Sequence, residues 1–542
     1  MCKNRILVGL CALLIASSAQ AQSRYYDISK NLEIFANAYR ELNQSYVDDL
    51  DPNKLLRMSM DAMLGGLDPF TNYISETDIE SYRLASEGRY NGLGAQGRLM
   101  GDYVVLTDMF KDSPAQKAGL KVGDAIIEVE GRSTKGRSEE QVLEFMRGAA
   151  GTDLTLTIRR PGESRDLKIT VKREEIEAPN VPYSGMVADG IAYVNLSTFT
   201  ANAGPNVLKA LRDLEKDHKL SGVILDLRHN GGGLLSEAVN LVGGFVPRGE
   251  FVVSMKGKSP ENDQEFRSLS APWNTDIRLA VLIDSKSASA SEIVSGALQD
   301  LDRAVIIGQR SYGKGLVQNV KEVGYNAKIK LTTAKYYIPS GRCIQSARYK
   351  NGEPVNIPDS ERAVFRTRNK RPVLDGGGVT PDIMLPADTA SNYVKALLEQ
   401  HVIFDYVTQF CAKTPHIDSA AVFKFQDWED FKNYVTQTRK FAYESPAEKA
   451  LAQMRLLAGA DNYAVDAELA TLEQKIKAAK QNELERNKAR IVREIEQEIV
   501  SRYHYARGKV QKRLNNDPEV EEAIRVLNDP ERYRSILKGM PK

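Results

Sequence analysis

The chain has 542 residues, of which 42% are hydrophobic, and its 74 Lys and Arg residues against 72 Asp and Glu residues leave a net charge of +2. This length predicts several domains, and the hydrophobic fraction is that of a globular protein rather than a disordered one. Because the charge is nearly balanced, nothing predicts a nucleic acid or an acidic surface as a partner.

The N-terminus has the pattern of a processing signal. Lys3 and Arg5 precede the apolar run Ile6 to Ala16, which is too short to span a bilayer as a helix, and Ala19-Gln20-Ala21 offers small residues to a signal peptidase. We expect residues 1–21 to be a signal peptide. No later segment is apolar enough to cross a membrane, so the mature protein is predicted to be exported, periplasmic and soluble.

Two cysteines, Cys343 and Cys411, remain after removal of the signal. In an oxidising compartment they could form one disulfide, although two separate buried thiols are the favoured interpretation. Neither supports a metal site, which typically needs about four ligands. We therefore predict neither a metal nor a cofactor.

Residues 22–85 are predicted to be a helical N-terminal region. Apolar residues recur there at helical spacing, at Ile28, Leu32, Phe35, Tyr39 and Leu42. The glycines and proline of residues 65–69 end a second helix. Because this piece is small, we expect it to pack on a neighbouring domain.

Residues 86–175 are predicted to form a separate β-rich module. A glycine-rich opening is followed by strands at 104–107 and 154–159, a helix at 139–147, and the run SPAQKAGLKVGDAIIEVEG from Ser113 to Gly131. This order resembles a PDZ domain. The resemblance implies that a free chain end binds by strand addition, with its carboxylate on main-chain N–H groups of the loop formed by Asn91, Gly92, Leu93 and Gly94. The alternative is a tight glycine turn without a ligand.

Residues 176–390 alternate between predicted strands and helices, which favours a layered α/β core. Strands are predicted at 190–196, 222–227, 278–283 and 304–307, helices at 203–216, 234–245 and 291–301, and two further strands in 316–338.

Residues 391–542 are predicted to be a charged, helical C-terminal region. One apolar stripe suggests a single long helix, marked by Leu469, Leu472, Ile476, Leu484, Ile491, Ile495 and Ile499. Its alternating charges are typical of a solvated face. An interaction or dimerisation surface is the other interpretation.

A serine cluster at residues 287–291 and a Gly-Lys-Gly turn at residues 313–315 are the main candidates for catalysis. A serine hydroxyl needs a base to remove its proton. Of the five histidines only His229 lies near a candidate motif, and a Ser/His/Asp triad stays open. A lysine can serve instead if burial lowers its pKa from about 10.4. Lys314 fits, because the chain from Asp302 to Glu322 has no acidic residue between its ends.

Two features near the cluster have both structural and catalytic interpretations. Ser289 and Glu292 form an S-x-x-E capping box at a helix start, where a nucleophile would also gain from the helix dipole. The glycine turn at residues 230–233 exposes N–H groups that suit an oxyanion hole. A phosphate cradle is the alternative for this turn, although it lacks the glycine patterns of nucleotide-binding loops.

Taken together, these motifs resemble those of the C-terminal processing, or tail-specific, serine proteases of bacteria. The resemblance covers roughly residues 30–386 and includes LDPF at 67–70, DLRHNGGGLL at 226–235, SASASEI at 287–293, GKGLVQ at 313–318 and GVTPDI at 378–383. It implies a multidomain α/β protein with a Clp-protease/crotonase-like core and an inserted PDZ domain. By the family pattern, Ser289 is the nucleophile, Lys314 the base and Gln318 its orienting residue. The oxyanion donors are then the N–H groups of Ala290 and Gly232.

The function that the resemblance implies is an exported serine endopeptidase that recognises protein C-termini through its PDZ domain and cleaves near the chain end. One alternative is a non-catalytic PDZ scaffold or chaperone. A second is an acyl-CoA enzyme on a crotonase-like core, which the signal peptide disfavours. The sequence leaves open whether an adaptor or a second copy of the chain takes part.

Overall fold

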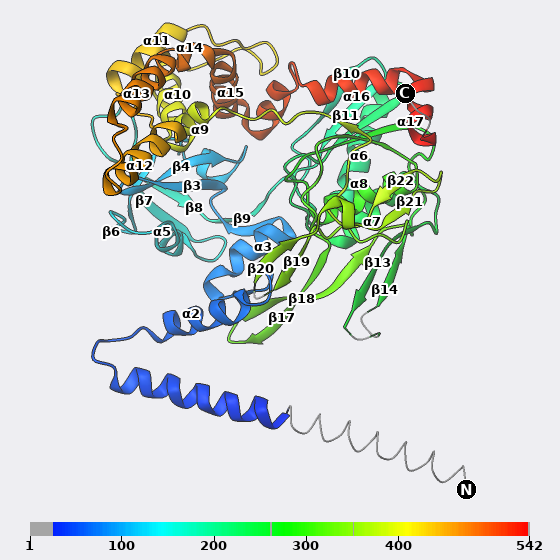
Figure 1. Ribbon diagram of the computed structural model, residues 1–542, viewed down its shortest axis with the longest axis horizontal. Helices are drawn as coiled ribbons and strands as arrows, with labels where there is room; N and C mark the ends of the chain where they lie inside the picture. The colour runs from blue at the N-terminus through cyan, green and yellow to red at the C-terminus, as the bar shows by residue number, and fades with distance from the viewer. Residues whose placement is uncertain (1–24, 259, 261–262, 351, 540–542) are drawn as a thin grey trace.

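The computed structural model describes residues 25–258, 260, 263–350 and 352–539. The chain forms an α/β core, a β-rich module and a helical C-terminal region. Most of the C-terminal helices lie beside the module, whereas the last helices return to the core (Figure 1). The predicted signal peptide lies outside the described residues. Among the described residues, none of the helices combines the length and apolarity that a bilayer-spanning helix needs.

A six-stranded sheet forms the centre of the core. Its strand order is β10 (Tyr183–Ala188), β11 (Ile191–Asn195), β12 (Gly222–Asp226), β15 (Arg278–Ile283), β16 (Val305–Gly308) and β23 (Ile383–Met384). β10 is antiparallel to β11, and the remaining neighbours are parallel. Most of the predicted strands of the core therefore exist within a residue or two of their expected bounds.

Helices cover both faces of this sheet, which explains why its strands are apolar throughout. Val223 and Leu225 of β12 pack in the cluster that includes residues of α6 (Ala203–Asp217), α7 (Leu235–Gly243) and α8 (Ala290–Asp300). Ile224, between them, packs in a second cluster with α16 (Pro518–Asn528) and α17 (Pro530–Lys538). Alternate residues of one strand thus serve two cores.

A second, antiparallel sheet stands beside the first. Its order is β1 (Asn72–Ile74), β18 (Ala327–Tyr337), β13 (Phe251–Gly257) and β14 (Gln264–Arg267), with β17 (Leu316–Gly324) paired to β18. Two small hairpins follow, β19 (Ala347–Lys350) with β20 (Glu353–Asn356), and β21 (Val364–Arg366) with β22 (Pro372–Leu374). The long strand β18 joins the N-terminal region to the core.

The module is a six-stranded antiparallel sheet with two short helices. The strands are β3 (Ala95–Met100), β4 (Tyr103–Met109), β5 (Ala125–Val129), β6 (Arg132–Ser133), β7 (Asp153–Arg159) and β8 (Leu167–Lys172), and the helices are α4 (Pro114–Lys117) and α5 (Glu139–Met146). β2 (Arg89–Gly92) pairs with β9 (Glu174–Glu177) where the chain enters and leaves the module. This pair closes the insertion.

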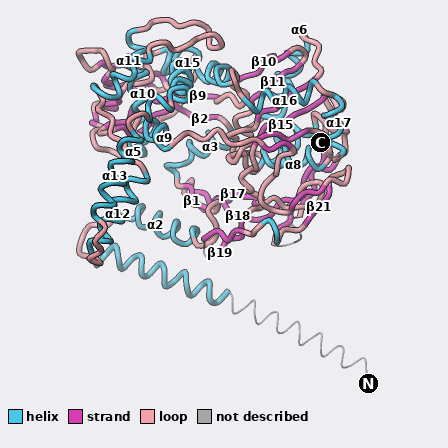
Figure 2. Tube along the Cα trace, turned by 45° about the horizontal axis from the view of Figure 1, so that its top comes forward, coloured by secondary structure: helices cyan, strands magenta, loops and turns pink. Residues whose placement is uncertain are grey.

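The N-terminal region only partly meets the expectation that it packs on a neighbour. α2 (Pro52–Gly65) ends at the predicted glycines, and α3 (Ile79–Glu87) leads into the module. Residues 25–45 are helical but extend away from the body in both views (Figures 1 and 2). Ile28, Leu32 and Phe35 are exposed there. Packing on a neighbour is therefore wrong for this helix, because none of the residues that the structure describes covers its apolar face.

The C-terminal region contains many helices, and the single long helix is wrong. The helices before α16 are α9 (Asn392–Glu399), α10 (Val402–Lys413), α11 (Trp428–Asn433), α12 (Pro446–Ala460), α13 (Asp466–Lys480), α14 (Glu483–Arg486) and α15 (Lys488–Arg513). The helical run is interrupted at residues 481–482 and again at Asn487, whose φ of −97° and ψ of 5° depart from helical values. Leu472 is 46% exposed, so the apolar stripe is not continuous.

α15 connects two packing environments. Ile491, Ile495 and Ile499 lie in the cluster of the helical region, whereas Val510 packs against the cluster beneath α16. Between them the helix is interrupted at Tyr505, whose φ of 54° and ψ of −159° are not helical. The C-terminal region therefore contacts the core through α16 and α17 and reaches the module through α10 and α15.

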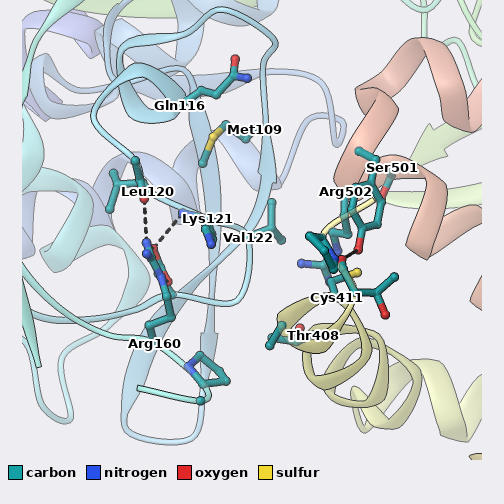
Figure 3. Close-up of a pocket in the computed structure, with 18 of the residues that line it drawn as sticks. Met109, Gln116, Leu120, Lys121, Val122, Arg160, Thr408, Cys411, Ser501 and Arg502 are labelled. Carbon is teal, nitrogen blue, oxygen red and sulfur yellow. Dashed lines mark hydrogen bonds and ion pairs between the residues drawn. The ribbon is translucent and has the colours of Figure 1, made fainter. Parts of the chain in front are cut away.

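The module and the helical region enclose a cavity of about 540 Å³. Figure 3 shows Met109, Leu120 and Val122 of the module on one side and Cys411 of α10 and Arg502 of α15 on the other.

Cys411 and Cys343 are both free and half-buried, which confirms two separate thiols.

Leu527→Ala tests the packing of α16 on the central sheet. Leu527 is fully buried, and its truncation should lower the free energy of unfolding by about 2–5 kcal/mol through lost burial and the cavity it leaves. Val422→Ala is the control, because Val422 is 63% exposed. Its free energy of unfolding should lie within about 0.5 kcal/mol of the wild-type value. Denaturant unfolding measures both, and equal effects would contradict the packing described.

Candidate active site

Ser289 occupies a strained position at the start of α8. Its φ of 55° and ψ of −113° lie in a sparsely populated region for a residue with a side chain. The residue is half-buried, and α8 behind it is buried along its whole length. Such strain persists only where surrounding contacts fix it, and here it presents one serine at a helix N-terminus.

The structure separates Ser289 from its neighbours in the serine cluster. The hydroxyl of Ser287 donates to the carbonyl of Leu227 at 2.8 Å, and that of Ser291 donates to the carbonyl of Asn230 at 2.9 Å. Both serines are fully buried. Ser287 and Ser291 therefore bind the serine loop to the glycine turn, and of the three only Ser289 is available for chemistry.

Glu292 is a buried carboxylate on which both catalytic segments converge. It accepts the N–H of Ser289 at 2.8 Å and that of Lys314 at 2.8 Å. It also accepts the N–H of Gly313 at 2.6 Å and the hydroxyl of Ser311 at 2.5 Å. Burial raises the pKa of Glu292 to about 7, and these hydrogen bonds oppose the rise. The capping interaction expected for Glu292 is thus half of a larger junction.

Tyr336 of β18 joins the same two residues through their carbonyls. Its hydroxyl lies 3.2 Å from the carbonyl oxygen of Ser289 and also donates to that of Lys314. The side chain is 1% exposed, and burial raises the pKa of Tyr336 well above its usual value. Glu292 and Tyr336 together fix the main chains of Ser289 and Lys314 relative to each other.

Lys314 lies in the tight turn before β17, half-buried. Burial lowers the pKa of Lys314 to about 8, and the nearby charge of Lys330 lowers it further, whereas Glu292 and Asp68 act in the opposite direction. Both acidic residues come from outside the segment between Asp302 and Glu322. The absence of acids in that segment therefore did not describe the surroundings of the lysine.

No hydrogen bond joins the Lys314 amine to Ser289 among the described residues. Its Nζ lies 4.4 Å from the centroid of the Phe70 ring, and the described residues give it no hydrogen-bond acceptor. Gln318 Nε2 donates to Thr332 Oγ1 at 3.3 Å instead of contacting the lysine. The structure thus brings Ser289, Lys314 and Gln318 into one region, but their side chains are not hydrogen-bonded to one another.

The predicted oxyanion donors differ in availability. The N–H of Ala290 is the first of α8 and meets no acceptor among the described residues. The N–H of Gly232 donates to Asn230 Oδ1 at 2.9 Å. Gly232 has a φ of 99°, and a Cβ there would lie 2.7 Å from that of Ser289. The glycine turn therefore does meet the serine, while its N–H is occupied in this state.

His229 is paired away from Ser289. Its Nδ1 lies 2.8 Å from Asp284, and its ring is 56% exposed. No hydrogen bond joins it to Ser289 among the described residues. A Ser/His/Asp arrangement therefore lacks its geometry here.

The glycine turn begins in a buried network of charges. Arg228 contacts Asp226 at 2.7 Å. It also contacts Asp517, the N-cap of α16, at 2.8 Å, and Glu519 of α16 at 3.2 Å. Burial opposes both shifts, but Asp226 and Asp517 raise the pKa of Arg228, and Arg228 lowers that of Asp226. This network connects the C-terminal region to the turn that faces Ser289, a link between segments far apart in sequence.

The predicted peptide-binding loop is only partly free. Asn91 and Gly92 belong to β2, and the N–H of Asn91 donates to Glu80 at 2.9 Å. Leu93 is buried, while Gly94 has a φ of 74°. Burial raises the pKa of Tyr90, and hydrogen bonds from the Gly94 and Ala95 main chain oppose that rise. Of this loop, the N–H of Asn91 is therefore already occupied in this state.

No cluster of three or more potential metal ligands occurs among the residues that the structure describes. The site is built from a hydroxyl, an amine, amides, main-chain N–H groups and the buried carboxylate of Glu292. Sequence reasoning missed Tyr336 and Asp68 as parts of it, because only the pairing of β17 and β18 and the docking of residues 68–71 bring them there.

Comparisons with known proteins agree with this architecture. Residues 190–352 match the family model "Peptidase family S41", residues 105–160 match "PDZ domain", and residues 393–527 match "Probable PDZ-protease, C-terminal helical domain". The carboxy-terminal-processing protease of Bartonella bacilliformis is 35% identical over 337 residues, which cover 62% of this chain and 77% of the relative. A probable CtpA-like serine protease of Staphylococcus aureus is 34% identical over 330 residues, which cover 60% of this chain and 65% of the relative.

Among solved structures, the photosystem II D1 C-terminal processing protease aligns with 25% identity and a TM-score of 0.35, covering 67% of this chain and 94% of that one. The family models and the curated relatives place the chain among serine-type peptidases that carry a PDZ domain. It belongs to the carboxy-terminal-processing protease family.

Glu292→Gln tests the junction between the two catalytic segments. The amide keeps the size of the side chain but has one accepting oxygen instead of two, so at least one donor loses its partner. We expect a loss of at least about 10-fold in kcat/KM for a peptide substrate and about 1–3 kcal/mol in the free energy of unfolding. Glu322→Gln, on an exposed side chain, is the matched control and should change neither. Wild-type values for Glu292→Gln would contradict this role.

Proposed function

We propose that the mature chain is an exported serine endopeptidase that binds protein C-termini through its PDZ domain and cleaves near the chain end by a Ser–Lys mechanism. The observation that carries the proposal is the geometry of Ser289. It is the available serine of its cluster, strained at a helix N-terminus beside the N–H of Ala290, which meets no acceptor in the described part of the chain. Glu292 fixes its main chain to that of Lys314.

In the proposed reaction, Lys314 accepts the proton of Ser289 as Oγ attacks the scissile carbonyl. The negative charge that develops on the carbonyl oxygen is stabilised by the N–H of Ala290, joined by that of Gly232 once Asn230 releases it. Lys314 then donates the proton to the leaving amine. A water molecule hydrolyses the acyl-enzyme, and the serine is regenerated. Gln318, on the neighbouring strand, orients the amine.

The protonation state of Lys314 limits this reaction near neutral pH. Because its pKa is lowered only to about 8, most of the amine is protonated at pH 7. A substrate strand that covers the site removes water and disfavours the ammonium further. The mechanism therefore predicts that binding of substrate and activation of the base are linked.

The PDZ domain, the signal sequence and the location of the substrates complete the proposal. The β3 edge and α5 provide the strand-and-helix arrangement in which chain ends bind to PDZ domains. The predicted signal peptide supports a periplasmic location for the enzyme, its substrates and any adaptor. No cofactor takes part.

Ser289→Ala tests the catalytic assignment. The variant should lose at least about 10³-fold in the rate of cleavage of an unfolded substrate, because no other hydroxyl replaces the nucleophile. Ser285→Ala is the matched control, since Ser285 is exposed and outside the site, and it should cleave at the wild-type rate. Gel or mass-spectrometric assays measure both. If Ser289→Ala cleaves like the wild type, the PDZ scaffold without catalysis becomes the better explanation.

A substrate with an amidated C-terminus tests recognition of the chain end. The amide removes the charge that the loop at residues 91–94 is proposed to bind, so affinity should fall by at least about 10-fold. Ser289→Ala protein allows binding to be measured by calorimetry without cleavage, with the free-acid peptide of the same sequence as the control. Equal affinities for the two peptides would remove carboxylate recognition from the proposal.

A further inference from the structure

The proposed mechanism gives no task to the Leu67-Asp68-Pro69-Phe70 motif. Phe70 is half-buried, and its ring centroid lies 4.4 Å from Lys314 Nζ. This is the distance at which an aromatic face attracts an ammonium group. A second ring, Tyr349 of β19, meets Phe70 edge-on at a centroid separation of 6.0 Å and supports its orientation.

The turn that carries Phe70 is firmly attached to the sheet behind Lys314. Asp68 is 8% exposed and accepts the N–H groups of Phe70 at 2.8 Å and Thr71 at 2.9 Å. Its carboxylate also accepts the hydroxyl of Thr332 at 3.2 Å. Thr332 in turn accepts the hydrogen bond from Gln318. The position of the Phe70 ring is thus fixed by the hairpin that carries Gln318.

Charged and titratable groups surround Lys314 from several elements. Lys330 of β18 disfavours the ammonium form, whereas Glu292 of α8 and Asp68 favour it. The phenol of Tyr336 contacts the main-chain carbonyl of Lys314, and Tyr349 lies behind the Phe70 ring. The ring of Phe70 lies directly against Nζ.

We propose that Phe70 is a positioning residue for Lys314. The ring of Phe70 binds the ammonium form and keeps the amine from hydrogen-bonding to Ser289 until substrate enters. An aromatic face attracts the charged form and has little attraction for the neutral amine. The amine that acts as base must therefore leave the ring, lose its proton and reach Ser289. This inference rests on the proposed Ser–Lys mechanism and assigns the resting place of its base.

The proposal predicts a particular effect on pH dependence. The acidic limb of the kcat/KM profile reports ionisation in the free enzyme, in which the Lys314 amine lies against the Phe70 ring. The acidic limb of the kcat profile reports ionisation in the substrate complex, in which the amine has left the ring. Removing the aromatic face destabilises the ammonium, so the pKa of Lys314 falls and the kcat/KM limb moves to lower pH. A stronger aromatic face moves it to higher pH. The kcat limb should stay in place in both cases.

Phe70→Leu and Phe70→Trp form the test, measured with a peptide slow enough that chemistry limits turnover. The leucine variant should shift the kcat/KM limb down by about half a pH unit or more, and the tryptophan variant should shift it up. Phe35→Leu, on the exposed helix away from the site, is the control and should leave the limb in place. A purely structural role would lower rates in both variants without opposite shifts.

A second readout does not depend on activity. In full-length Ser289→Ala labelled with ¹³C at lysine Cε, the resonance that Lys314→Met removes should titrate at lower pH with Phe70→Leu and at higher pH with Phe70→Trp. If the leucine variant does not fold, the tryptophan variant against the wild type still decides. If neither the Lys314 titration nor the acidic limb of kcat/KM shifts, the role of Phe70 is overturned, but the proposal that cleavage depends on Ser289 is unaffected. Cleavage that survives Ser289→Ala defeats the mechanism itself, and the titration then reports the contact alone.

Discussion

The buried carboxylate of Glu292 determines the geometry of the catalytic region. It receives hydrogen bonds from the main chains of Ser289, Gly313 and Lys314 and from Ser311. A buried carboxylate without partners is strongly unfavourable, so the donors are as necessary to Glu292 as it is to them. Because they belong to the α8 start and to the turn before β17, neither segment can move independently while these bonds exist.

The strand β18 provides the complementary constraint from the other side. Lys330 and Thr332 share one face of the strand, whereas Tyr336 follows a bulge in the pairing with β17 that lies between Thr332 and Ala334. Lys330 affects the charge of Lys314, Thr332 connects Gln318 to Asp68, and Tyr336 contacts the carbonyls of the catalytic residues. One strand thus sets the electrostatics, the side-chain network and the main-chain position of the base.

The sequence predicted those parts of the protein that local pattern determines. The apolar runs of β12 and β15 are continuous because both faces are covered, and they were found nearly to the residue. The environment of Lys314 was not predictable in the same way. Asp68 and Glu292 reach it only through tertiary packing, so the absence of acids nearby in sequence did not predict their absence in space.

The errors in the helical regions have a similar origin. Apolar spacing alone suggested one long helix, but the helical run is interrupted at residues 481–482 and at Asn487. Spacing also predicted the helix of residues 25–45 correctly, but not whether anything covers it. Periodicity reports which face of a helix is apolar, whereas the partner of that face depends on the rest of the fold.

The C-terminal region is part of the structural framework of the site, because it contacts both the core and the PDZ domain. α16 places Glu519, and Asp517 at its N-cap, on Arg228 at the start of the glycine turn, while α10 and α15 line the cavity facing the PDZ domain. These two contacts are joined by α15, whose geometry changes at Tyr505. The position of the PDZ domain relative to the turn beside Ser289 is therefore set by two connections. One is the strand pair β2 and β9, and the other is the path through α15 and α16.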